Sequence, residues 1–295
     1  MNDDIRFMAR TLELARRGLY TTHPNPRVGC VIVREGEIVG EGFHARAGEP
    51  HAEIHALRMA GEQARGATAY VTLEPCCHHG RTPPCSDALM AAGVARVVAA
   101  MRDPNPRVDG GGEAVLCAAG VAVESGLFEA EARELNVGFS KRMTLGLPFV
   151  RLKWGASLDG RTALADGESQ WITGTEARRD VQFWRAQSSA VLSSAESVIT
   201  DNARLNVRLT AAELGIEGEV RQPVRVILDR ELRLLPDLPI FDGQGEVWIY
   251  TASDDAVKRV ALAAVGARVY SAPLDGERLD LRWILHDLAQ REINE

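Results

Sequence analysis

The chain has no long apolar run and no excess of positive charge. Among its 295 residues, 45% are hydrophobic and 25% are charged, which are the proportions of an ordinary soluble globular protein. No window approaches the continuous apolar length that a membrane span needs. The formal net charge of −7 argues against the broad basic surface that nucleic-acid binding requires. We therefore expect a small-molecule substrate, with no nucleic-acid partner and no membrane.

The amino terminus also lacks the features of a secretory signal. It begins Met-Asn-Asp-Asp, without a basic flank followed by an apolar core. Cysteine is scarce, with five residues in the whole chain, and the cluster between residues 76 and 85 suits a metal site better than disulfide bonds. These two observations predict a cytoplasmic protein.

The residues with the most distinctive chemistry gather between positions 51 and 85. His51 begins a His-Ala-Glu triplet, and the thiols of Cys76 and Cys85 follow. One histidine and two cysteines are ligands that zinc prefers, and three such ligands leave a fourth tetrahedral position open for water. Glu53 is close enough to carry a proton of that water without binding the metal. A His-x-Glu triplet followed by Pro-Cys is the signature of zinc deaminases.

The adjacent thiols of Cys76 and Cys77 leave the choice of ligand open on spacing alone. We assign Cys76, because the residue directly after Pro75 matches the signature. Cys85 lies farther from Cys76 than in the Cys-x-x-Cys loop of nucleoside and nucleic-acid base deaminases. The residues between them, His78 to Pro84, therefore look like a family-specific loop.

Other kinds of protein fit this pattern less well. A structural zinc knot is usually closed by four protein ligands, and Glu53 would have no role in one. A deaminase of free cytidine or of a base in tRNA would need a Cys-x-x-Cys loop and, for tRNA, a basic face. The sequence has neither feature.

The first half of the chain alternates predicted helices and strands, which indicates a layered α/β sheet. The zinc ligands are expected at strand-to-helix junctions, where helix N-termini stabilise thiolates. The apolar patterns predict helices over 3–18, from 51, and over 85–92, 113–119 and 129–141, and strands over 28–33, 38–43, 69–73, 95–100 and 121–124.

A second α/β domain is predicted to begin after Gly146, which places the domains at 1–146 and 147–295. It contains no Gly-x-Gly-x-x-Gly motif after a strand, so a bound dinucleotide cannot be inferred from that fingerprint. The expected strands are 149–154, 190–192, 224–229, 247–251 and 268–271, and the expected helices are 175–187 and 279–291.

The whole chain closely resembles the bifunctional deaminase-reductases of bacterial riboflavin biosynthesis. The resemblance rests on motifs at residues 23–26, 51–53, 74–85, 155–161 and 167–173. It implies a first domain with the three-layer cytidine deaminase fold, which removes an amino group from a diaminopyrimidinone ribosylamine phosphate. It also implies a second domain with a dihydrofolate-reductase-like fold, which uses NADPH to reduce the ribosyl group to ribityl. We also expect a homo-oligomer, namely a dimer.

The resemblance assigns roles residue by residue. Zinc falls to His51, Cys76 and Cys85, and the proton shuttle to Glu53. The residues matching the deaminase substrate pocket are Asn25, His44 and His78; those matching the cofactor site are Lys153, Gly155, Trp171, Ser197 and Asp201; and those matching the sugar-phosphate site are Ser169, Arg185, Leu205 and Arg208.

Ordinary structural roles compete more strongly with these assignments in the second domain. A tryptophan is more often a core residue than a cofactor platform, and Gly155 could serve only a turn. An arginine on a helix usually lies on a solvated face. Arg185 and Arg208 are nevertheless supported by chemistry, because a guanidinium group binds phosphate through two hydrogen bonds.

The chain departs from the family pattern at its end. The family continues with a further strand, a Glu-Ala-Gly motif, a cofactor-binding glycine loop and closing strands, whereas this sequence stops at Glu295. The reductase domain is therefore expected to be incomplete. The alternative to two activities is a deaminase whose reductase domain is inactive.

Overall fold

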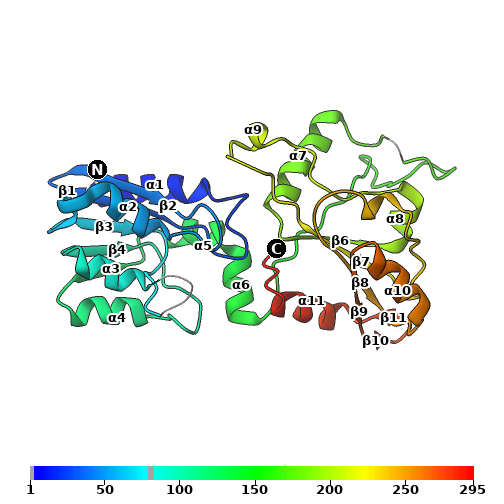
Figure 1. Ribbon diagram of the computed structural model, residues 1–295. Helices are drawn as coiled ribbons and strands as arrows, with labels where there is room; N and C mark the ends of the chain where they lie inside the picture. The colour runs from blue at the N-terminus through cyan, green and yellow to red at the C-terminus, as the bar shows by residue number, and fades with distance from the viewer. Residues whose placement is uncertain (1–2, 79–82, 170) are drawn as a thin grey trace. The chain divides into compact units, whose positions relative to one another are not determined.

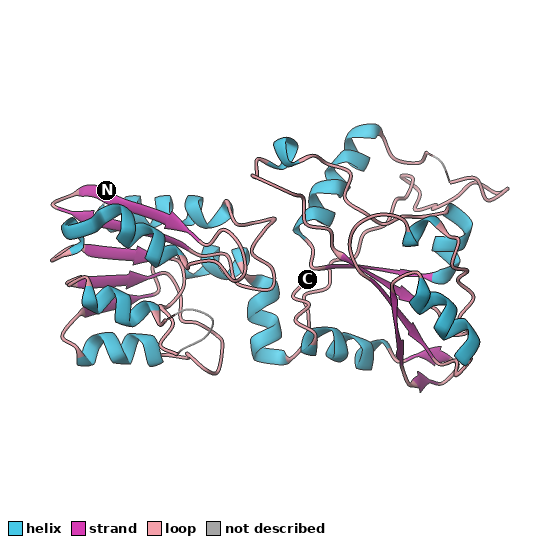
Figure 2. Cartoon of the chain, viewed as in Figure 1, coloured by secondary structure: helices cyan, strands magenta, loops and turns pink. Residues whose placement is uncertain are grey.

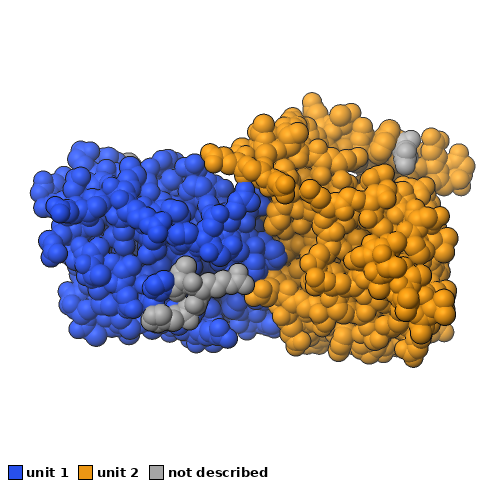
Figure 3. Space-filling model, in the orientation of Figure 1, with its two compact units in different colours: residues 1–147, 294 blue, residues 148–293, 295 orange. Residues whose placement is uncertain are grey.

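The computed structural model describes residues 3–78, 83–169 and 171–295 (Figure 1). Residues 79–82, in the loop between Cys76 and Cys85, and Gln170 of the 167–173 motif therefore lie outside the described residues. The chain divides into two compact units, residues 1–147 with 294 and residues 148–293 with 295 (Figure 3). Among the described residues, no helix has the length and apolar character needed to cross a membrane.

Unit 1 is built on a five-stranded mixed sheet in the order β2-β1-β3-β4-β5. Strand β1 runs antiparallel to both of its neighbours, and β3, β4 and β5 run parallel. The carboxyl ends of β3 and β4 therefore meet at one edge of the sheet. The strands are β1 (Gly29–Arg34), β2 (Glu37–Phe43), β3 (Thr68–Val71), β4 (Arg96–Ala99) and β5 (Ala122–Ser125).

Helices cover both faces of this sheet (Figure 2). The strand residues alternate between two cores: Ile32 faces one, whereas Val31 and Val33 face the other. Helices α2 (Ala52–Ala60), α3 (Cys85–Ala91) and α4 (Gly111–Ala118) close the first core, and α1 (Asp3–Arg16), α5 (Glu129–Leu135) and α6 (Val137–Leu145) close the second. A short 3₁₀ helix, η1 (Gly61–Ala64), follows α2. This is the three-layer arrangement that the family resemblance implies.

Two glycines of β2 allow helix α2 to lie unusually close to the sheet. A Cβ atom at Gly40 would lie 2.2 Å from the carbonyl oxygen of Ala56, and one at Gly42 would lie 2.4 Å from that of Ala52. Neither oxygen can move away without moving the helix backbone. The absence of side chains at these two positions therefore determines how close α2 lies to the sheet. The first turn of α2 carries Glu53.

The predicted helix 129–141 is two helices, because the chain breaks at Asn136. The Asn136 side chain is buried and pairs with the backbone of Arg27, accepting from its N–H at 2.7 Å and donating to its carbonyl at 3.0 Å. Asparagine side chains compete in this way with regular helix hydrogen bonding. The break ties α5 and α6 to the segment before β1.

Unit 2 contains a four-stranded parallel sheet in the order β6-β7-β8-β9. Helices α8 (Ala195–Asp201) and α10 (Ala256–Ala264) pack on one face, and α11 (Leu281–Gln290) packs on the other. The remaining elements are β6 (Ala190–Ser194), β7 (Val224–Leu228), β8 (Val247–Thr251), β9 (Ala267–Ser271), α7 (Thr175–Gln187), α9 (Ala211–Leu214), η2 (Pro239–Phe241) and the hairpin β10 (Leu274–Asp275) and β11 (Arg278–Leu279). The predicted α/β class is confirmed for both units.

The prediction of a strand over residues 149–154 is wrong. These residues join no strand within the described part of the chain. Val150, Leu152 and Trp154, which alternate along the segment, are 55%, 78% and 65% exposed. The apolar alternation that predicted a half-buried strand therefore meets no packing surface. Helices α8 and α10 were not predicted.

Candidate active site

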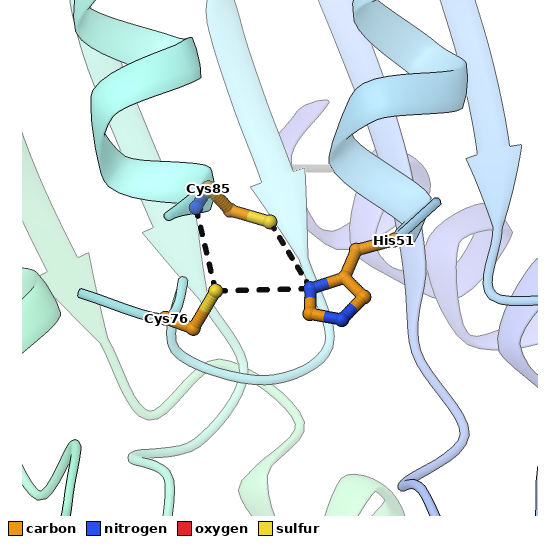
Figure 4. A group of neighbouring side chains, drawn as sticks. All are labelled: His51, Cys76 and Cys85. Carbon is orange, nitrogen blue, oxygen red and sulfur yellow. Dashed lines mark hydrogen bonds between the residues drawn. The ribbon is translucent and has the colours of Figure 1, made fainter. Parts of the chain in front are cut away.

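Three predicted zinc ligands converge in unit 1 from three separate pieces of backbone (Figure 4). His51 is the N-cap of α2, Cys85 is the first residue of α3, and Cys76 lies in the loop after β3. Their ligand atoms all lie within 4.8 Å of one another. His51 and Cys85, 34 positions apart in the sequence, share one site because α2 and α3, whose N-terminal ends carry them, pack against each other.

The spacing of the donor atoms fits a tetrahedral zinc ion. Nδ1 of His51 lies 3.3 Å from Sγ of Cys85 and 3.7 Å from Sγ of Cys76. Zinc–nitrogen and zinc–sulfur bonds of the usual lengths hold a nitrogen and a sulfur about 3.6 Å apart in a tetrahedron. Cys77 is not part of this group, and its Sγ lies 4.0 Å from the carbonyl oxygen of Arg107.

The two thiols of the site differ in how readily they ionise. The pKa of Cys76 is lowered, mainly by its hydrogen bond with the Cys85 thiol and further by His51. The same contact raises the pKa of Cys85. The backbone N–H of Cys85, in the first turn of α3, also donates to Sγ of Cys76 at 3.3 Å. Of the two thiols, Cys76 is therefore the one that ionises first.

Glu53 lies beside these ligands and is only 3% exposed. Its Oε2 has no hydrogen-bond partner within the part of the chain that the structure describes. Burial raises the pKa of Glu53, and the negative charge of Cys76 raises it further. A carboxyl group with a raised pKa and an oxygen that has no partner in the described residues is well suited to accept and return protons.

Asn25 and His44 form a chain of hydrogen bonds next to His51. Nδ1 of His44 lies 3.2 Å from the carbonyl oxygen of Pro50, which only accepts, so Nδ1 carries the hydrogen. Nε2 of His44 then accepts from Nδ2 of Asn25 at 3.0 Å. Burial lowers the pKa of His44, which favours this neutral form. The amide of Asn25 is oriented by this chain.

The remaining predicted pocket residue, His78, lies at the start of the long loop between Cys76 and Cys85. Its Nδ1 is buried and has no hydrogen-bond partner among the described residues. A buried ring nitrogen without a partner is available for a ligand, because native proteins usually satisfy such atoms.

Two buried acids near the site were not found by reading the sequence. Asp103 follows β4, and its pKa is raised to about 7, chiefly by burial and also by its neighbours Glu74 and Cys76. Glu74 immediately precedes Pro75 and is 3% exposed. The available signal was positional, since acids that follow adjacent parallel strands meet at the same sheet edge.

In unit 2, the predicted sugar-phosphate residues Arg185 and Arg208 lie close together. Burial lowers the pKa of Arg185, and the charge of Arg208 lowers it further. Nη1 of Arg185 donates to the carbonyl oxygen of Asn206, and Oε1 of Gln182 accepts from the backbone N–H of Arg208 at 3.0 Å. Neither guanidinium forms an ion pair with an acid in residues 3–78, 83–169 or 171–295. Leu205, in the same segment, has a left-handed φ of 55°.

The predicted cofactor residues of unit 2 fall into separate groups. Ser197 lies on α8, where its N–H donates to Oγ of Ser194 at 3.2 Å, and Asp201 ends the same helix. Lys153 and Gly155 lie together in a segment without helices or strands. Trp171 is 68% exposed, and the guanidinium carbon of Arg178 lies 4.3 Å from the centroid of its ring. Ser169 is likewise exposed, and these groups share no hydrogen bond with the arginine pair in the described chain.

Two family models match the two units. The cytidine and deoxycytidylate deaminase zinc-binding region matches residues 1–101, and the RibD C-terminal domain matches residues 148–295. The first match includes the three predicted zinc ligands and Glu53. The second covers the residues predicted to bind the cofactor and the sugar phosphate.

Curated relatives match nearly the full length of the chain. Riboflavin biosynthesis protein RibD of Escherichia coli strain K12 is 54% identical over 296 residues, covering 99% of this chain and 80% of the relative. The protein of the same description from Aquifex aeolicus is 43% identical and covers 98% and 78%.

Solved structures show the same relationship. Acinetobacter baumannii RibD, form 1, superposes with a TM-score of 0.90 at 49% identity, covering 99% of this chain and 79% of that one. A diaminohydroxyphosphoribosylaminopyrimidine deaminase/5-amino-6-(5-phosphoribosylamino)uracil reductase from Thermotoga maritima superposes with a TM-score of 0.84 at 38% identity, covering 99% and 79%.

Proposed function

This chain belongs to the RibD family of riboflavin biosynthesis proteins, and from that premise we propose that it is a bifunctional deaminase and reductase. Unit 1 removes an amino group from a diaminopyrimidinone ribosylamine phosphate by hydrolysis, which releases ammonia. Unit 2 then reduces the ribosyl group of the product to ribityl with NADPH. The observation that supports the first activity best is the convergence of His51, Cys76 and Cys85 beside the buried Glu53.

In the deamination, His51, Cys76 and Cys85 would hold zinc and Glu53 would carry protons. A bound zinc ion lowers the pKa of water toward 7 and so supplies a nucleophile at neutral pH. Oε2 of Glu53 would take one proton from the attacking water and give it to the ring nitrogen as the new C–O bond forms. It would then take the second proton from the new hydroxyl and give it to the amino group, so that the C–N bond breaks, the carbonyl forms and ammonia leaves. Because Oε2 has no hydrogen-bond partner among the described residues, it is available for this transfer.

Asn25, His44 and His78 are proposed to orient the pyrimidine. The hydrogen bonds from Asn25 through His44 to Pro50 fix which end of the Asn25 amide donates to His44. The other end, Oδ1, then presents an acceptor for an N–H of the substrate. His78 would contribute its Nδ1, which has no partner in the part of the chain that the structure describes.

In the reduction, Arg185 and Arg208 are proposed to bind the sugar phosphate, with Ser169 and Leu205 at the same site. Two close guanidinium groups, neither paired with an acid in the described residues, create a local positive charge that a phosphate dianion neutralises. Lys153, Gly155, Trp171, Ser197 and Asp201 are proposed to contact NADPH. The nicotinamide would deliver hydride to the sugar carbon of the opened imine.

The two proposed activities are tested by supplying the phosphorylated diaminopyrimidine and following ammonia release and NADPH oxidation separately. We expect both signals, with ammonia release preceding NADPH oxidation. Ammonia release without NADPH oxidation would support the alternative, a deaminase with an inactive reductase domain. NADPH oxidation on addition of the deaminated intermediate isolates the second step from the first.

Replacing Arg208 with glutamine is expected to raise KM for the deaminated substrate by about 10- to 100-fold, because charge-assisted hydrogen bonds to phosphate contribute about 1.5–3 kcal/mol. Steady-state NADPH oxidation measures this change. Arg204→Gln is the matched control, since Arg204 lies in the same segment but is 55% exposed and pairs with Asp242. Equal KM values for both variants would remove Arg208 from the phosphate site. Ammonia release should stay at the parental rate in both.

Three further properties belong to this proposal. The functional domains are residues 1–146 and 147–295, the enzyme forms a homodimer, and it works in the cytoplasm. Light scattering of the purified protein tests the dimer, and a single chain per particle would contradict it. Cell fractionation tests the location.

A further inference from the structure

The carboxylate of Glu74 is the centre of an unusual set of hydrogen bonds. It is 3% exposed and accepts four backbone N–H groups from one segment of the chain. Oε2 accepts from Asp103 at 3.1 Å and Gly110 at 3.0 Å. Oε1 accepts from Gly112 at 2.9 Å and Glu113 at 3.1 Å, in the first turn of α4. Both oxygens of one side chain are thus used to hold residues 103–113.

Glu74 also lies two residues before Cys76, in the loop that follows β3. Strand β3 ends at Val71, and the N–H of Thr72 still donates to the carbonyl oxygen of Gly29 in β1 at 3.2 Å. The N–H of Glu74 donates to the carbonyl oxygen of Met101 at 2.9 Å. The loop after β3 is therefore joined to the loop after β4 through both the main chain and the side chain of Glu74. These two strands are neighbours in the sheet (Figure 1).

A second contact between the same two loops is made of backbone alone. A Cβ atom at Gly112 would lie 2.0 Å from the carbonyl oxygen of Pro75 and 3.2 Å from Oε1 of Glu74. The start of α4 thus touches the peptide directly before Cys76. Only glycine permits this approach, because any Cβ atom at position 112 would overlap the carbonyl oxygen of Pro75.

We propose that Glu74 is a positioning residue for deamination, which sets Cys76 in place by anchoring the Pro75-Cys76 backbone to residues 103–113. This inference rests on the proposed deaminase function. The ligand loop is held from its far side by the N–H groups of α3, which contact Cys76. Glu74 supplies the restraint from the near side. Residues that orient metal ligands typically change metal affinity or activity by about 10- to 100-fold when they are replaced.

The test replaces Glu74 with glutamine in the full-length zinc-loaded protein. Glutamine retains the shape, but one oxygen becomes an NH₂ group that faces N–H donors, so two of the four hydrogen bonds are lost. We expect zinc release to a chelator to quicken by about 10- to 100-fold and kcat for ammonia release to fall by about tenfold, with KM little changed. The cobalt-substituted protein should show a shifted visible ligand-field spectrum, which reports the ligand geometry without any turnover.

Two further measurements separate positioning from folding. Glu113→Gln is the matched control, because Glu113 pairs with Arg102 through its side chain but accepts none of these backbone N–H groups. Gly112→Ala keeps the carboxylate and pushes against Pro75, and it should reproduce the zinc release and the cobalt spectrum of Glu74→Gln. NADPH oxidation with the deaminated intermediate should be unchanged in every variant, which shows that unit 2 is folded, and a parental far-UV circular dichroism spectrum shows that unit 1 keeps its helices and strands.

Parental zinc release and an unaltered cobalt spectrum in both Glu74→Gln and Gly112→Ala would overturn the inference. If Glu74→Gln also loses NADPH oxidation, the Gly112→Ala variant decides the question by the same two measurements. Failure of the parental protein to release ammonia would refute the proposed deamination instead, and the zinc and cobalt measurements would still report on Glu74.

Discussion

Replacing Glu53 with glutamine is expected to lower deamination by about 10²- to 10⁴-fold, the contribution typical of a well-placed acid-base group. Glutamine has nearly the same shape and fills the same buried space, so α2 should keep its position against β2. What is lost is the ability of Oε2 to accept a proton and return it. Initial rates of ammonia release at saturating substrate measure the effect.

The zinc content of Glu53→Gln should equal that of the parent, at about one ion per chain, because Glu53 is not one of the three proposed ligands. Metal analysis of the purified protein checks this. NADPH oxidation with the deaminated intermediate provides a second control within the same molecule. A fall in ammonia release of less than tenfold would show that another group carries the proton, and Asp103, with its pKa of about 7, would then be the next to test.

Replacing Cys85 with serine is expected to remove most of the bound zinc and with it nearly all deamination. A site with three protein ligands has no spare donor, and a serine hydroxyl is a poor substitute for a thiolate. The small change in volume should leave α3 in place. Zinc content after gel filtration and ammonia release are the two readouts.

Cys77→Ser is the matched control, because Cys77 lies next to a ligand in sequence while its Sγ approaches Arg107 instead of His51. It should keep its zinc. Full zinc retention in Cys85→Ser would remove Cys85 from the ligand set and favour Cys77 or His78 as the third ligand. Loss of zinc from both variants would show that the whole loop, not one thiol, determines binding.

The sequence predicted the α/β class, the family and most elements of both sheets, because these depend on short-range patterns. Helix α7 has its predicted bounds, and β3 and β8 lie where buried apolar runs predicted them. The spacing of His51, Cys76 and Cys85 is also a local signal with few alternative meanings. Patterns of this kind can be read without knowing what packs against them.

The errors occurred where the outcome depends on distant partners. The break at Asn136 is made by the backbone of Arg27, more than 100 positions away. Residues 149–154 have the alternation of a strand but no neighbouring strand in the described chain. Glu74 is an ordinary acid in the sequence, and only the folded chain brings four N–H groups to its oxygens. Such roles are properties of tertiary structure and have no local signature.

The two glycines of β2 make the proposed metal site sensitive to residues that do not contact it. Because Gly40 and Gly42 lie against the carbonyl groups of α2, a single added methyl group would act as a wedge under the helix. The added group would push α2 away from the sheet, and Glu53 and His51 would move with the helix. The distance between Glu53 and His51 would stay the same, whereas their distance from Cys76 and Cys85 would grow. Loss-of-function substitutions in this enzyme are therefore expected to collect along a strand that contributes no chemistry of its own.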